Sequence, residues 1–108
     1  MPKKGTVVLV PFPFTDLSGF KVRPAVVISN VALGEDVIVV FVSSKETRIR
    51  KSDMAVSPSE TNGIKIRSII KCAKIATLEK KIILGELGVL EPSVMKGVES
   101  KLRLVLGM

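Results

Sequence analysis

The stretch Phe12–Ser29 passes from a polar loop into an unbroken apolar run. Its sequence is Phe-Pro-Phe-Thr-Asp-Leu-Ser-Gly-Phe-Lys-Val-Arg-Pro-Ala-Val-Val-Ile-Ser. Pro24 restricts the preceding Arg23 to an extended backbone. Pro24 can also occupy the first position of a strand, where no ladder donor is needed. The pattern predicts a strand over Pro24–Asn30 with a cation at its mouth, which is where a binding or catalytic arginine would be placed.

Short apolar segments separated by turn residues continue along the chain and favour a mainly β fold, a small barrel or sandwich, over a helical bundle. Further strands are expected at Gly5–Val10, Asp36–Ser44, Met54–Ser57, Ile64–Ile70 and Cys72–Leu78. Pro11 and Pro13 are expected to end the first strand, and Asn62-Gly63 is a tight-turn signal before Ile64. Alternation over Ile64–Ile70 predicts that Arg67 and Lys71 share a polar face.

The end of the chain carries helical signals. Thr77 can cap a single helical turn that runs through Lys81, and an apolar segment follows at Ile82–Leu90. Pro92 suits the first position of a longer helix, whose apolar residues recur at helical spacing. Gly107 suits its end. We therefore expect one domain over residues 1–108, with five or more strands and a closing C-terminal helix.

Composition indicates whether the chain folds and in which cellular compartment it is expected. The chain has 108 residues, 46% of them apolar, which is enough for a folded core. A single cysteine, Cys72, favours a reducing compartment and a core position. The longest clean apolar run, between Asp36 and Ser43, is too short to span a membrane, and the N-terminus lacks a signal-peptide pattern. We expect a cytoplasmic protein without a membrane partner.

Charge and residue usage narrow the chemistry. Lysine and arginine number 17 against 10 acids, a net charge of +7, which favours nucleic acid or an acidic protein as a partner, although solubility alone also explains such a balance. Histidine is absent, so Ser-His and Cys-His nucleophiles are excluded, and most zinc sites with them. No cofactor is expected, and any chemistry must use Arg, Lys, Ser, Thr or isolated acids.

Two positions are candidates for that chemistry. Arg23 begins one predicted strand and Ser43 ends the next, so an antiparallel pairing through the short Leu33-Gly34-Glu35 connection brings them to one rim. A guanidinium fork suits a phosphate, and a hydroxyl can donate one more hydrogen bond to a developing oxyanion. The alternative is a surface ion pair for Arg23 and an ordinary strand end for Ser43.

Several blocks of the sequence resemble the MazF/PemK toxins of toxin–antitoxin systems. They are Gly5–Val8, Arg23–Ser29, Val39–Ser44, Ser68–Ile70 and Lys74–Glu79, while Phe12–Asp16 followed by Ser18-Gly19 is closest to the PemK-like branch. The resemblance implies an SH3-like β-barrel with a C-terminal helix, acting as a homodimer. It also implies metal-independent cleavage of single-stranded RNA at short sequences, leaving a 2′,3′-cyclic phosphate and a 5′-OH, and neutralisation by a small acidic antitoxin.

By motif, the family's catalytic arginine corresponds to Arg23, an electrostatic stabiliser and candidate proton donor to the leaving 5′-oxygen. The family's catalytic hydroxyl, usually a threonine, corresponds to Ser43. Two departures stand out. Serine lacks the β-branch that fixes χ1, and the Gly-x-Glu-Gln segment that often precedes Arg-Pro is replaced by Ser18–Val22. The general base stays unassigned, because a guanidinium remains protonated.

Cations around the two candidate positions form a possible RNA track of salt-dependent phosphate contacts. Phe20 can stack a base, whereas Phe41 is expected in the core. The candidate RNA-binding residues are Phe20, Lys21, Ser44, Lys45, Arg48, Arg50, Lys51, Arg67 and Lys71. The alternative for each cation alone is a solvated side chain. Two other functions stay open: a non-catalytic barrel that inhibits gyrase, like CcdB, and a degenerate member that only binds RNA or antitoxin.

Overall fold

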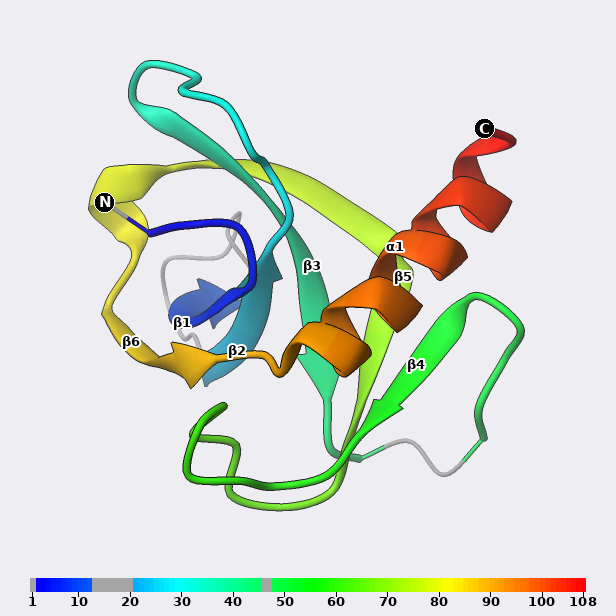
Figure 1. Ribbon diagram of the computed structural model, residues 1–108. Helices are drawn as coiled ribbons and strands as arrows, with labels where there is room; N and C mark the ends of the chain where they lie inside the picture. Colours follow the sequence, from blue (N-terminus) through cyan, green and yellow to red (C-terminus); the bar gives the residue numbers. More distant parts are fainter. Residues whose placement is uncertain (1, 13–20, 46–47) are drawn as a thin grey trace.

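The computed structural model describes residues 2–12, 21–45 and 48–108. Its elements are β1 (Thr6–Phe12), β2 (Lys21–Val27), β3 (Asp36–Ser43), β4 (Asp53–Val56), β5 (Ser68–Glu79), the 3₁₀ turn η1 (Lys80–Ile82), β6 (Gly85–Val89) and α1 (Pro92–Leu106). The described strands form one six-stranded antiparallel sheet in the order β4-β5-β3-β2-β1-β6. The sheet curls into a half-barrel, with α1 beside β4 and β5 (Figure 1). The predicted mainly β fold with a C-terminal helix is confirmed.

Both faces of the central strands are buried, which explains why their sequences read as continuous apolar runs. One core lies between the sheet and the helix, where Val26 and Val40 pack with Met95 and Val98 of α1. A second core forms on the other face around Val8, Val10, Ala25, Val27, Val37, Val39 and Leu78, with Phe41, Ile82 and Ile83 packed against it. Cys72 belongs to the first core and is fully buried, as predicted.

Two of the three prolines expected to bound strands lie inside them, and the third, Pro13, lies outside the described residues. Pro11 is part of β1, opposite Val22, and Pro24 is the fourth residue of β2, opposite Leu9. The predicted boundaries were wrong because the missing N–H of proline costs nothing at a position that needs no ladder donor. The β2–β3 pairing begins at Ala25, opposite Phe41, one residue after Pro24.

The segment before β5 differs most from its prediction. Residues 64–67 are not strand, and β5 runs unbroken from Ser68 to Glu79. Its first five residues are buried on both faces, so the expected two-sided alternation is absent. Lys71 is buried, whereas Arg67 is exposed, and the two do not share a polar face.

Both predicted helical elements, a single turn and a longer C-terminal helix, are present, but the start of the single turn was predicted wrongly. Thr77 lies within β5 and caps nothing, while η1 starts after Glu79. Helix α1 does begin at Pro92, and it ends at Gly107, whose φ of 70° is left-handed. Among the described residues, no helix has both the length and the apolar character needed to cross a membrane.

Candidate active site

A pocket of about 240 Å³ opens where β1 and β3 end and β2 begins. Its described lining consists of Phe12, Arg23, Phe41, Val42, Ser43, Lys45, Lys71 and Lys74. Four of these residues are cations, and no described residue of the lining is acidic. Such a cavity attracts anions, because a negative group that enters it reduces the electrostatic repulsion among the positive side chains of its wall.

Strand register brings Arg23 and Ser43 to the same pocket. Ala25 of β2 pairs with Phe41 of β3, and the two candidate residues each lie two positions further toward the open end. Side chains two residues apart on a strand share a face, so all four side chains lie on one face of the sheet. Beyond Ala25 the β2–β3 ladder stops, and Pro24 has no N–H to extend it. The space between the two strand ends therefore belongs to the pocket.

Ser43 also positions the chain that follows β3. Its Oγ accepts a hydrogen bond from the backbone N–H of Lys45 at 3.4 Å. This hydrogen bond joins residues two positions apart and therefore turns the backbone at the end of the strand. The side chain of Lys45 lines the same pocket as Ser43. The ammonium of Lys21, and beyond it the guanidinium of Arg23, lower the pKa of Lys45.

Lys71 differs from the other pocket cations in being buried. Its Nζ lies 3.2 Å from Oδ2 of Asp53, which is buried as well. The same carboxylate oxygen accepts the backbone N–H of Arg50 at 2.9 Å, so one acid connects β5 to the segment before β4. Lys71 lines the pocket from a fixed position, so the alternative of a solvated side chain does not apply to it.

The other predicted RNA-binding residues lie at varied distances from the pocket. Lys21 and Ser44 are exposed and adjoin it along the chain. The remaining cations are exposed on the segment between β3 and β4 or just before β5, outside the described lining: Arg48, Arg50, Lys51 and Arg67. Phe20 lies outside the described residues.

Four residues of the lining were missed by sequence reasoning: Phe12, Phe41, Val42 and Lys74. Phe41 was expected in the core, but it is half-buried and shares the pocket wall with Phe12, at a ring-centroid distance of 5.4 Å. Lys74 was not singled out at all. Phe41 was predictable, because it lies two residues before Ser43 and therefore on the same face of the strand. For Lys74 the sequence offered no signal, because the sheet register that brings it to the pocket is irregular between Val40 and Phe41.

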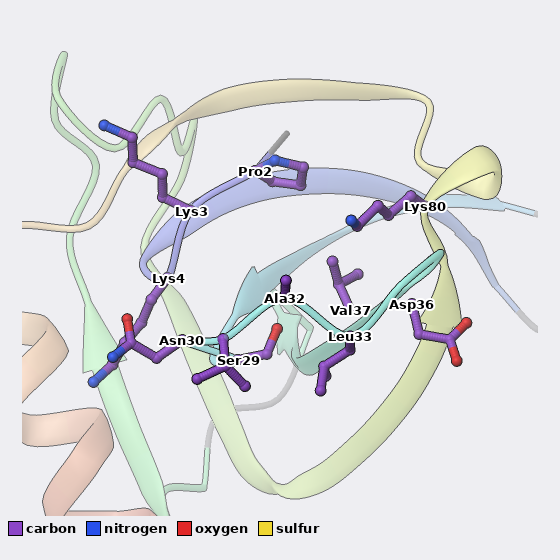
Figure 2. Close-up of a pocket in the computed structure, with 11 residues that line it drawn as sticks. Pro2, Lys3, Lys4, Ser29, Asn30, Ala32, Leu33, Asp36, Val37 and Lys80 are labelled. Carbon is purple, nitrogen blue, oxygen red and sulfur yellow. The ribbon is translucent and has the colours of Figure 1, made fainter.

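A larger pocket of about 430 Å³ lies at the opposite ends of β2 and β3, between the N-terminal residues and the β2–β3 connection (Figure 2). Two of its three lysines are already engaged. Lys80 Nζ donates to the carbonyl oxygen of Gly34 at 2.8 Å, and Lys4 forms an ion pair with Glu99 of α1. The smaller pocket is therefore the better candidate for an anionic ligand.

The model of the family described as "PemK-like, MazF-like toxin of type II toxin-antitoxin system" matches residues 3–106. The chain belongs to this toxin family. Its fold is shared by solved structures at low sequence identity. An endoribonuclease from a mycobacterial species, in complex with its cognate antitoxin, is 22% identical over 100% of this chain and 97% of the other, with a TM-score of 0.82.

Two structures from Deinococcus radiodurans extend the comparison. MazF is 20% identical over 99% of this chain and 97% of its own, with a TM-score of 0.78. A MazE–MazF complex gives 22% identity over the same shares, with a TM-score of 0.80. These likenesses establish that the six-stranded sheet and C-terminal helix of this toxin-family chain are the MazF fold.

Proposed function

We propose that this chain is the toxin of a type II toxin–antitoxin pair and acts as an endoribonuclease on single-stranded RNA. The observation that carries the proposal is the meeting of Arg23 and Ser43 at one cationic pocket from two different strands. The name of the family and the endoribonuclease relatives of the same fold support it.

The proposed reaction uses a nucleophile that RNA itself supplies. The ribose 2′-oxygen attacks the adjacent phosphorus, the bond from phosphorus to the 5′-oxygen breaks, and the products carry a 2′,3′-cyclic phosphate and a 5′-OH. Such a reaction needs stabilisation of the negative charge that gathers on the phosphorane. Arg23 is suited to bind the non-bridging oxygens through its planar fork, and Ser43 to donate one further hydrogen bond.

Partners follow from the same assignment. The net charge of +7 suits both RNA and an acidic antitoxin, and a cognate antitoxin is bound in the mycobacterial and Deinococcus complexes. We propose that an antitoxin segment covers the cationic pocket and that the active form is a homodimer. The mass of the purified protein, measured by light scattering with and without antitoxin, tests the second statement.

Digestion of a long single-stranded RNA in EDTA tests the activity. The expected products are discrete fragments with cyclic phosphate ends. Arg23→Ala is expected to lower kcat by about 10²–10³-fold, as loss of one charge-stabilising group does in other enzymes. Arg103→Ala, on the exposed side of α1, is the matched control and should cleave like the wild type.

Ser43 gives a second, graded readout of the same chemistry. Ser43→Thr keeps the hydroxyl and should retain cleavage, whereas Ser43→Ala should lose most of it. Intact RNA after incubation with the wild-type protein would contradict the proposal. Inhibition of gyrase supercoiling by that same preparation would instead place the chain among the non-catalytic barrels.

A further inference from the structure

We propose that Lys45 is the general acid of this site and gives its proton to the leaving 5′-oxygen. The inference rests on the proposed ribonuclease function and adds a proton donor to it. The groups that carry the argument are Lys45, its neighbours Lys21 and Arg23, and the hydroxyl of Ser43.

Geometry places Lys45 beside the reacting groups. The hydrogen bond from its backbone N–H to Ser43 Oγ fixes the start of the segment after β3, and its side chain lines the pocket with Arg23 and Ser43. A phosphodiester held between the guanidinium and the hydroxyl is thus within the same small cavity as the Lys45 ammonium. A proton donor must lie within hydrogen-bond reach of the atom it protonates, and a shared pocket wall is the arrangement that allows this.

The other described groups of the lining are less suited to donate a proton. Arg23 is the candidate proton donor that the family resemblance implies, but a guanidinium holds its proton firmly, so this residue is better suited to binding negative charge than to donating a proton. The Lys71 ammonium is buried against the carboxylate of Asp53, so this cation is already engaged within the protein. No carboxylic acid lies among the described lining residues, and histidine is absent from the sequence.

The electrostatic surroundings of Lys45 point the same way. Lys21 and Arg23 lower the pKa of its ammonium, which makes Lys45 a stronger acid than an ordinary surface lysine. The remaining charged groups that line the pocket, Lys71 and Lys74 on β5, carry the same sign. An alkoxide is a far stronger base than an amine, so transfer from the ammonium to the departing oxygen is favourable.

The proposed step balances as follows. The 2′-oxygen forms a new bond to phosphorus and releases its proton to a water molecule. The bond from phosphorus to the 5′-oxygen breaks, and its electron pair stays on that oxygen. Nζ of Lys45 transfers one proton to it, which yields the 5′-OH and a neutral amine. Solvent then returns a proton to the amine for the next turnover.

A sulfur substitution separates proton donation from charge. The experiment uses RNA cut at a site mapped with the wild-type protein, and a matched RNA with sulfur in place of the bridging 5′-oxygen at that site. A thiolate leaves without protonation, so a missing general acid matters only for the oxygen substrate. Lys45→Arg keeps the positive charge and is expected to lower kcat on the oxygen substrate by about 10²-fold while leaving cleavage of the sulfur substrate near the wild-type rate. Lys45→Met also removes a pocket charge, so it should slow both substrates somewhat and the oxygen substrate by about 10²-fold more.

Two control variants complete the design. Lys74→Met removes a pocket charge of β5 and should slow both substrates by the same factor. Lys96→Met, exposed on α1, should change neither rate. Equal losses for Lys45→Met on the oxygen and sulfur substrates, or full activity of Lys45→Arg on the oxygen substrate, would overturn the assignment of Lys45. Failure of the wild type to cut either RNA would instead refute the ribonuclease function, and the inference with it.

Discussion

At the scale of single residues, the buried ion pair between Asp53 and Lys71 has the largest expected effect on stability. Both side chains are almost completely buried, and Asp53 also accepts the backbone N–H of Arg50. Asp53→Asn keeps the shape of the side chain but removes the carboxylate charge from this buried pair. The expected loss in the free energy of unfolding is about 3–5 kcal/mol.

Urea unfolding at neutral pH measures that loss. Replacing both partners, as Asp53→Asn with Lys71→Met, removes both charges of the buried pair and should restore part of the stability. Glu79→Gln is the surface counterpart, because Glu79 forms an exposed pair with Lys81, and it should change the unfolding free energy by less than about 1 kcal/mol. An Asp53→Asn protein as stable as the wild type would show that the ion pair carries little energy.

The positions of site residues were predictable from sequence only where they follow from neighbouring predicted strands. Arg23 beside Pro24 and Ser43 after an apolar run could be expected at one rim, because they lie at facing ends of neighbouring predicted strands, and both line the same pocket. The burial of Lys71 was not predictable, since its partner Asp53 lies on another strand and pairs with it only through the sheet register.

At the scale of elements, the turn before residue 64 depends on glycine. Gly63 has a φ of +71°, and a Cβ built on it would lie 2.2 Å from the backbone oxygen of Leu87. Gly34 has a similar φ of +65° but nothing within 4 Å of such a Cβ. Gly34→Ala should therefore cost only the left-handed strain, about 1 kcal/mol. Gly63→Ala should cost several times more, because backbone must move. Thermal unfolding of the two variants makes the comparison, and equal melting temperatures would contradict it.

Hydrogen bonds connect the turn that precedes residue 64 to Glu91, at the start of α1. Ser59 Oγ donates to Glu91 Oε2 at 2.5 Å, and Asn62 Nδ2 donates to Glu91 Oε1 at 3.2 Å. The hydrogen bond from Ser59 is the main cause that lowers the pKa of Glu91 below its ordinary value of 4.5. A depressed folded-state pKa stabilises the protein above the unfolded value, and the contribution disappears as pH falls through the folded value.

Glu91→Gln isolates this contribution from other acids. The wild type should be more stable than the variant at neutral pH, and the difference should shrink as the pH is lowered below 4.5. Urea unfolding of both proteins at several pH values measures it. The comparison is needed because Lys4 also lowers the pKa of Glu99, which loses its stabilising effect over the same range. A difference that stays constant with pH would contradict the role of the carboxylate.

Element types were more predictable than element limits. Apolar runs and turn residues predict the strands, their order along the chain and the start of the helix at Pro92. Residues 64–67 resemble a strand in their alternation but carry an exposed Ile66. The backbone N–H of Ile64 donates to the buried side chain of Asn62 instead of to a neighbouring strand. Such a local hydrogen bond between side chain and backbone overrides the alternation pattern.

At the scale of the whole molecule, the charge excess should appear as salt dependence. The affinity for a single-stranded RNA made uncleavable by 2′-O-methylation should fall linearly, on logarithmic axes, with salt concentration. Loss of one phosphate contact in Lys74→Met should reduce the slope by about 0.7, the value for single strands. Lys96→Met should keep the wild-type slope, since its side chain lies on α1. Fluorescence anisotropy gives both slopes, and identical slopes for all three proteins would argue against Lys74 as a phosphate contact.

The position of Cys72 has a practical consequence for experiments on this protein. It is the single thiol of the sequence, it has no exposed surface, and burial raises its pKa to about 11. A thiol reagent can reach it only when the first core opens, so its rate of modification reports the frequency of large openings in the native state. Conversely, a cysteine introduced at an exposed position such as Lys51 would react alone, which gives a dye attachment point without first removing the natural thiol.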